Sequence, residues 1–214
     1  MNAPDLPSLI RADLARHAWW VIYLRYICAA AVVLGTVMLT QSMGARLDGA
    51  PLYGIAGALV AANVLYGVHL SRAARRTGGA LPDAAARSLI LQIGMDLFLL
   101  TLLLHFSGGV TNPLATLYVG PVLLAGFLLS VRSAYALAAL ALFLYGGMAI
   151  LEYRLIIPHV PIPGLFAPTA FRNESFLLVA LTAFCMAVGM AALISLTVSG
   201  RLRGQDAGEE ESEP

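Results

Sequence analysis

Four polar residues stand inside long apolar runs of the sequence, where side chains of these types could do chemistry. Gln92 and Asp96 lie four residues apart in one run, which places them on the same face of a helix. Arg25 and Asn63 stand at a similar depth in the two earlier runs. An ionisable group in an apolar environment is costly unless it is paired, so we predict that these four side chains form one polar cluster joining three helices.

Three roles are open for this cluster. Interhelical hydrogen bonds contribute about 0.6 to 2 kcal/mol each in membranes, so the cluster could simply hold three helices in register. It could instead transmit a conformational state along the helices, or carry protons or ions in a transporter. The sequence shows no inverted repeat and no matching pair of Gly/Pro-broken helices, which are the features expected of many transporters.

A second group of polar residues forms a short turn between two apolar runs, with the sequence SGGVTNP. Gly108 and Gly109 can adopt the left-handed conformation that ends a helix. Thr111 or Asn112 is suited to cap the following helix, and Pro113 is tolerated in its first turn. A tight turn between two helices therefore accounts for this motif without any ligand.

The same turn also has the groups that a site for a carbonyl compound would need. His105, the Asn112 amide and the glycine N–H groups are hydrogen-bond donors. Phe106 and Tyr118 would supply an aromatic wall. Apolar surface with a few donors suits a lipid-soluble quinone. His105 is equally consistent with an ordinary interfacial residue at a helix end, so both interpretations stay open.

The elements that position these residues follow from the composition. The chain has 214 residues, of which 59% are hydrophobic and 12% charged, whereas soluble proteins average about 45–50% apolar and about 25% charged residues. We therefore predict an all-α integral membrane protein, a bundle of six transmembrane helices, because only helices satisfy the backbone of such segments in lipid. The predicted spans are residues 19–42, 51–70, 88–106, 112–130, 134–152 and 174–199.

Within this plan, residues 19–200 form the membrane domain. Residues 1–18 form a cytoplasmic N-terminal segment, and residues 201–214 form an acidic cytoplasmic tail of disordered composition. The first apolar run is longer than the core of a signal peptide, so we expect it to be retained as a helix.

The arginines predict the orientation. All 13 basic residues are arginines, and six spans would place only Arg46, Arg154 and Arg172 on the side opposite the termini. The excess of positive charge near the termini predicts that both lie in the cytoplasm. The turn and the long connection 153–173 then lie on the outer side. This connection contains four prolines, and it is either a lid over the turn or a simple spacer.

Several classes of function are excluded by composition. A net charge of +1 without a basic patch argues against nucleic-acid binding. Cys28 and Cys185 are too few and too deep in apolar runs for a disulfide framework or a metal site. None of the four histidines stands mid-span in a paired register, so we expect no heme and no metal.

The sequence around the turn carries a family resemblance. Its residues are Gln92, Asp96, Thr101, Gly108, Gly109, Asn112, Pro113, Leu117 and Pro121. Together they resemble the third and fourth membrane helices of the Reg/Prr-type redox-sensing histidine kinases. In that family a GGxxNPF motif lies on the periplasmic side of a six-helix sensor domain and is implicated in binding ubiquinone. This chain has Leu114 where the family usually has Phe, and its Leu24-Arg25-Tyr26 resembles the start of the family's first helix.

The resemblance implies a sensor module in the bacterial inner membrane, surrounded by lipid, that responds to quinone redox state. Ubiquinone or another quinone would bind near the residues Gly108, Gly109, Asn112, Pro113, His105 and Tyr118. Kinases of the family work as dimers and carry phosphotransfer and ATP-binding domains. We find neither domain in these 214 residues, so we expect no enzyme activity from this chain. Kinase domains would have been lost by truncation, or a kinase or response-regulator partner would act in trans.

Two alternatives from other classes remain beside the sensor hypothesis. One is a small integral membrane transporter that uses Asp96. The other is a structural membrane protein without a ligand.

Overall fold

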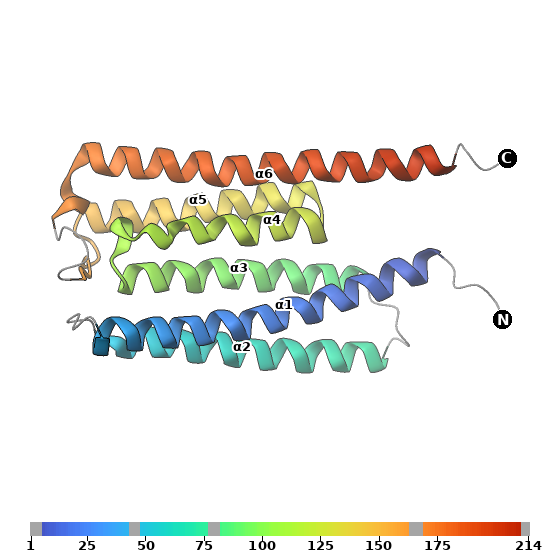
Figure 1. Cartoon of the computed structure of the whole chain (residues 1–214), viewed down its shortest axis with the longest axis horizontal. Helices are drawn as coiled ribbons and strands as arrows, with labels where there is room; N and C mark the ends of the chain where they lie inside the picture. Colours follow the sequence, from blue (N-terminus) through green and yellow to red (C-terminus); the bar gives the residue numbers. More distant parts are fainter. Residues whose placement is uncertain (1–5, 43–47, 77–81, 163–168, 211–214) are drawn as a thin grey trace. The chain divides into compact units, whose positions relative to one another are not determined.

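The computed structural model of the chain describes residues 6–42, 48–76, 82–162 and 169–210 (Figure 1). These ranges contain helices and irregular segments but no strand, which confirms the expectation of an all-α protein. The α-helices are α1 (Leu6–Val37), α2 (Gly49–Arg76), α3 (Pro82–Phe106), α4 (Val119–Leu128), α5 (Val131–Tyr153) and α6 (Glu174–Glu210). Shorter helical turns are η1 (Met38–Ser42, a π-helix), η2 (Gly109–Thr111), η3 (Pro113–Tyr118) and η4 (Ala170–Arg172).

The first and last helices run beyond the predicted spans. α1 begins at Leu6, before the span predicted from residue 19, and α6 continues through the first ten residues of the segment 201–214. Extending an existing helix adds one hydrogen bond per residue without a new nucleus, so polar residues next to an apolar helix readily join it.

Five helices within the described ranges are long and apolar enough to cross a membrane, as expected of a multi-pass membrane protein. They are Trp20–Gln41, Gly49–His69, Ser88–Phe106, Val131–Tyr153 and Glu174–Thr197. The predicted fourth span is a shorter apolar segment, Pro113–Leu128, divided between η3 and α4. Pro121 explains part of this division: it has no N–H to donate, and it stands in the first turn of α4, where none is needed.

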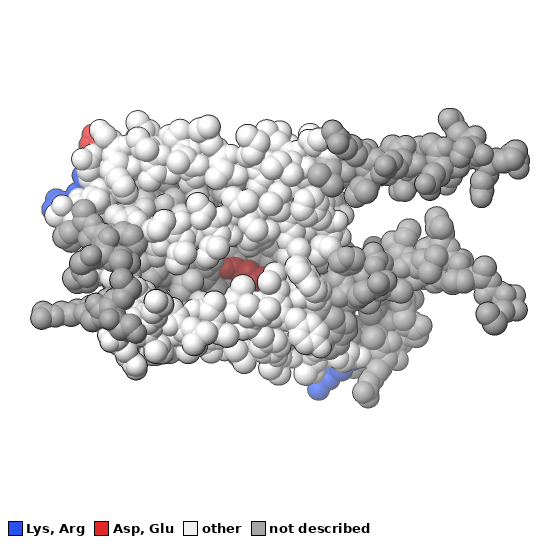
Figure 2. Space-filling view, in the orientation of Figure 1, with Lys and Arg blue, Asp and Glu red and all other residues white. Residues whose placement is uncertain are grey.

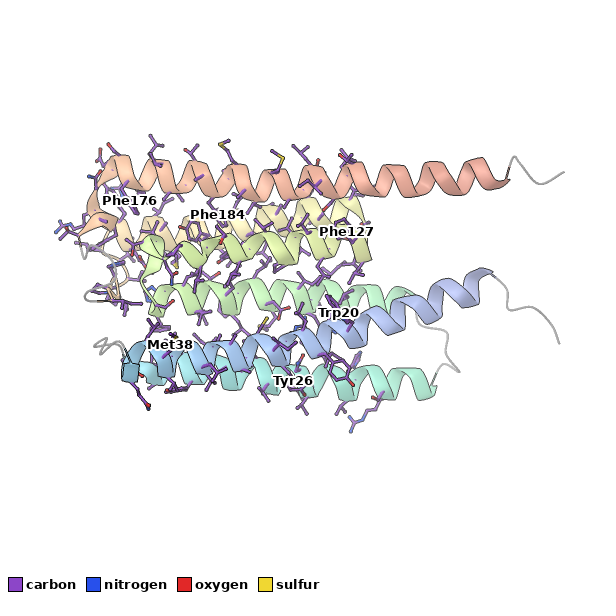
Figure 3. All side chains as sticks on the ribbon, in the orientation of Figure 1. Trp20, Tyr26, Met38, Phe127, Phe176 and Phe184 are labelled. Atoms are coloured by element: carbon purple, nitrogen blue, oxygen red, sulfur yellow. The ribbon has the colours of Figure 1, made fainter. Side chains whose placement is uncertain are left out.

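The exterior of the described helices is that of a protein immersed in lipid. Many large apolar side chains are exposed along the helices, including Tyr23, Leu65, Leu91, Phe143 and Met186. Figure 3 shows such side chains along nearly the whole length of the membrane-spanning helices. On the face seen in Figure 2, the described surface is almost entirely uncharged.

The chain divides into two compact units. The first is Met1–Ser107 with Ile162–Leu165, and the second is Gly108–Pro161 with Phe166–Pro214. In the first unit α1 packs against α2 and α3, and α2 also packs against α3. Its core is formed by small and branched apolar side chains, among them Ile22, Leu52, Ile93 and Leu97.

In the second unit α4, α5 and α6 pack against one another, and η2, η3 and η4 lie at their ends. The core contains an aromatic cluster of Tyr118, Tyr145 and Phe184, whose ring centroids lie 4.2–6.0 Å apart. α4 and α6 approach closely where Gly126 meets Ser195, because a Cβ atom on Gly126 would overlap the serine side chain. This contact makes the glycine necessary for the helix packing.

Candidate functional site

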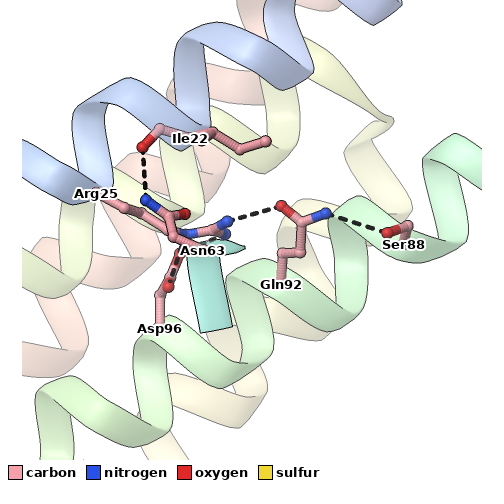
Figure 4. Close-up of polar contacts among 6 residues, drawn as sticks. All are labelled: Ile22, Arg25, Asn63, Ser88, Gln92 and Asp96. Atoms are coloured by element: carbon pink, nitrogen blue, oxygen red, sulfur yellow. Dashed lines mark hydrogen bonds and ion pairs between the residues drawn. The ribbon is translucent and has the colours of Figure 1, made fainter. Parts of the chain in front are cut away.

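The structure brings Arg25, Gln92 and Asp96 together in the first unit (Figure 4). Nε and Nη2 of Arg25 donate to the two carboxylate oxygens of Asp96 at 2.8–2.9 Å, which is a bidentate ion pair. Nη1 of Arg25 donates to Oε1 of Gln92 at 2.7 Å. Gln92 in turn donates from Nε2 to Oγ of Ser88 at 3.0 Å. The network joins α1 to α3, as the four-residue spacing of Gln92 and Asp96 led us to expect.

Asn63 attaches α2 to this network from the side. Its Nδ2 donates to the backbone oxygen of Ile22 at 2.7 Å, one turn before Arg25 on α1. The side chain of Asn63 is buried, and its Oδ1 has no hydrogen-bond partner. Tyr66, one turn further along α2, places its ring 5.4 Å from the guanidinium carbon of Arg25. All four predicted residues therefore lie in one region, although Asn63 contacts the backbone of α1 and not the ion pair.

The cluster is electrostatically balanced. The side chain of Arg25 is 5% exposed and pairs with Asp96, whose side chain is 24% exposed. A paired charge of this kind avoids most of the cost of burial, whereas either partner alone would be costly. Such a network suits a structural role, and it leaves the carboxylate of Asp96 partly accessible.

The turn predicted to cap two helices has that geometry. α3 ends at Phe106, and Gly108 and Gly109 have φ angles of 115° and 56°, in the left-handed region. Asn112 is the residue that caps η3: its Oδ1 accepts a hydrogen bond from the backbone N–H of Leu114 at 2.9 Å. Pro113 follows in the first position of η3. The capping interpretation of these residues is confirmed.

The residues proposed as quinone contacts have different surroundings. Gly108, Gly109 and Asn112 are buried and Pro113 is exposed, all in the second unit. Tyr118 is fully buried in the aromatic cluster, so its ring serves as core packing. His105, at the end of α3, is the sixth proposed contact. It belongs to the first unit and packs edge-to-face on Phe106.

A buried ionisable pair that we did not predict lies against this turn. Glu152, in the last turn of α5, is 0% exposed, and its Oε2 lies 2.8 Å from Nδ1 of His159. The same oxygen accepts from the backbone N–H of Val110 at 3.4 Å. A Cβ atom on Gly109 would overlap the Glu152 carboxylate. The second glycine is therefore needed for more than its backbone conformation, because it makes room for an acid.

Two further contacts complete this arrangement. The hydroxyl of Tyr145 donates to the backbone oxygen of Val110 at 3.3 Å. The ring of His159 stacks on Phe171 of η4, with centroids 4.1 Å apart and an interplanar angle of 18°. His159 of the long connection thus contacts α5, and η4 contacts η2 of the turn.

Sequence reasoning missed Glu152 because an acid at the end of an apolar run resembles an ordinary interfacial charge. One signal was available: His159 follows Glu152 by seven residues, within the only long connection on its side of the predicted bundle. Whether this spacing brings the two side chains together depends on the path of the connection. The four prolines of the connection do not determine that path.

One comparison with a known protein bears on function. The chain is 32% identical over 146 residues to the sensor histidine kinase RegB of Cereibacter sphaeroides. The match covers 66% of this chain and 30% of the length of RegB, so the chain corresponds to less than a third of that protein. No family model matches the sequence, and no solved structure matches it either. The chain is therefore distantly similar to a sensor histidine kinase.

Proposed function

We propose that this chain is the membrane-embedded signal-input module of a histidine-kinase-type sensor, and that it binds a quinone at the turn formed by Gly108, Gly109, Asn112 and Pro113. The observation that carries the proposal is the similarity to a sensor histidine kinase over 146 residues. The turn supports it as well, because it places backbone N–H groups and the Asn112 amide at one end of the second unit.

The proposed topology has six crossings with both termini in the cytoplasm of a bacterial inner membrane. Six 3₁₀ residues rise about 2.0 Å each and ten α residues about 1.5 Å each, so η3 and α4 together extend about 27 Å. The hydrocarbon core is about 30 Å thick. The shorter fourth segment therefore has nearly the length that a crossing requires.

The proposed mechanism is a shift between two packings of the second unit. A ligand can shift such an equilibrium only by the difference between its affinities for the two states. η3 and η4 both contact α6, so a ligand at the turn would act on α6 through them. α6 is helical from Glu174 to Glu210 and would carry the change along the chain to a kinase or response regulator, in the same or another polypeptide. A homodimer, as in the resembled family, would supply the partner for such a change.

The test is the thermal stability of the purified chain with and without decylubiquinone. Ligand at about 100 times its dissociation constant stabilises the folded state by about 2.7 kcal/mol, which raises Tm by roughly 5–10 °C for a protein of this size. Asn112→Ala removes both the amide and the cap of η3, whereas Asn112→Ser removes the amide and keeps a capping oxygen. We expect both variants to lose the ligand-induced shift and only the alanine variant to lose basal stability. Absence of any shift in the wild type would contradict quinone binding.

A transporter that uses Asp96 is a second candidate, because the Asp96 side chain is partly exposed in the middle of a predicted membrane span. It would be supported by proton-coupled flux into liposomes that is lost in Asp96→Asn. If neither quinone binding nor flux is found, a structural role is left.

A further inference from the structure

The strongest unassigned feature is the pair of Glu152 and His159. Both side chains are removed from solvent, at 0% and 3% exposure. They join α5 to the connection that follows it, and Glu152 also holds the turn through Val110 N–H. Nothing in the proposed function so far uses either side chain.

His159 has one ring nitrogen with a partner and one without. Nδ1 is bonded to Glu152, and one face of the ring is covered by Phe171. Nε2 is buried and has no hydrogen-bond partner. Buried polar atoms are nearly always hydrogen-bonded, so an orphaned ring nitrogen at this depth points to a group that occupies the site in another state.

The number of protons on the pair determines whether Nε2 donates or accepts a hydrogen bond. One proton lies between Nδ1 and Oε2; with that proton alone, Nε2 has a free lone pair and accepts a hydrogen bond. A second proton, taken up by the imidazole at Nε2, makes that nitrogen a donor and the pair neutral overall.

Other titratable groups near the pair are few among the described residues. Tyr145, on the same helix as Glu152, donates its hydroxyl to the turn. Arg154 and Arg172 are exposed, and Glu174 of α6 accepts a hydrogen bond from Tyr153 at 2.7 Å. η2 carries no titratable side chain, and the one in η3, Tyr118, is packed in the aromatic cluster.

We propose that Nε2 of His159 is a hydrogen-bond contact for an oxygen of the ligand, and that the proton content of the Glu152–His159 pair selects the form of that oxygen. The doubly protonated pair donates to a carbonyl oxygen. The singly protonated pair accepts from a hydroxyl. This inference rests on the proposed function, since a quinone presents carbonyl oxygens and its reduced form presents hydroxyls. The proposal concerns binding of the ligand only, and no electron is transferred. Because Nε2 is covered, contact requires a local opening of the described residues around His159.

The experiment measures binding of decylubiquinone and decylubiquinol to the full chain in lipid nanodiscs, under anaerobic conditions, at pH 6 and pH 9. For the wild type we expect the ratio of quinone affinity to quinol affinity to fall at least tenfold from pH 6 to pH 9. A change of one bound proton alters an affinity by up to tenfold per pH unit, so this effect is within reach of one titrating pair.

His159→Asn is the sharpest variant, because its amide nitrogen can replace Nδ1 in the bond to Glu152 while nothing replaces Nε2. We expect it to keep the fold, to bind quinone at least tenfold more weakly and to show no pH-dependent preference. Glu152→Gln should flatten the pH dependence. Tyr153→Phe removes a neighbouring hydrogen bond to Glu174 and is the matched control. We expect this variant to have the wild-type ratio of quinone affinity to quinol affinity at both pH values.

The outcomes separate the two proposals. If the wild type binds neither form, the proposed function and this inference are both wrong. If the wild type binds and Asn112→Ser weakens binding, but His159→Asn keeps the wild-type affinities and ratio, the inference is wrong and the proposed function stands. A wild-type ratio that does not change with pH also overturns the inference. Thermal unfolding of each variant establishes that it is folded before its affinities are compared.

Discussion

At Gly109 two constraints coincide on one residue. Its backbone has φ 56°, and the carboxylate of Glu152 occupies the space that a Cβ atom would need. Gly109→Ala should therefore destabilise the protein by about 1–3 kcal/mol, the usual cost of a strained backbone residue, with the steric overlap in addition. Gly120→Ala is the control, because nothing lies within 4 Å of its Cβ position. Thermal unfolding in detergent should show a loss of several degrees for the first variant only, and equal values for both would contradict the assigned contact.

Breaking the ion pair between Arg25 and Asp96 should also destabilise the protein. Asp96→Asn leaves the buried guanidinium of Arg25 without its counter-charge, which should cost about 3–5 kcal/mol. Adding Arg25→Gln removes the orphaned charge, so the double variant should be more stable than Asp96→Asn alone. Asp48→Asn, at an exposed acid, is the control. A double variant as unstable as the sum of the singles would show that the two residues act independently.

Some of the site residues could be predicted from the sequence and others could not. Arg25, Gln92 and Asp96 were predictable, because charge in an apolar run demands a partner and helical spacing limits where it lies. The caps at Gly108 and Asn112 were predictable from local backbone chemistry. The pairing of Glu152 with His159 was not, since it depends on the path of an irregular, proline-rich connection.

Among the elements, α4 and α6 of the second unit approach closely at Gly126 and Ser195. Gly126→Ala should overpack this crossing and cost about 1–3 kcal/mol. The double variant Gly126→Ala/Ser195→Gly moves the small residue to the other helix and should recover most of the loss. Gly189→Ala, with open space at its Cβ position, should change stability little. Unfolding midpoints of the three variants test the packing, and no rescue would argue against it.

The elements were predictable in number and approximate position but not in kind. Apolar length predicted a helix in each of the six segments, and each contains one. It did not predict that the fourth begins as a 3₁₀ helix. That outcome involves two prolines without a backbone N–H, Pro113 at the first position of η3 and Pro121 in the first turn of α4.

For the whole molecule, the fourth segment decides the topology. If η3 and α4 cross the membrane, the C-terminus lies in the cytoplasm, and fluorescent-protein fusions there should be bright while phosphatase fusions are inactive. If they do not cross, both readouts should reverse. Phosphatase fusions after Arg46 are the control: this connection precedes the fourth segment, so they should be active in either case.

The contact of Gly109 with Glu152 has a consequence for how such a protein can change over evolutionary time. The absence of a side chain at one position is the condition for an acid at the other. Substitution at position 109 should be accepted only in sequences where position 152 has become small, and an acid at position 152 should occur only with glycine at position 109. Related chains should therefore show these two positions, 43 residues apart, varying as one unit.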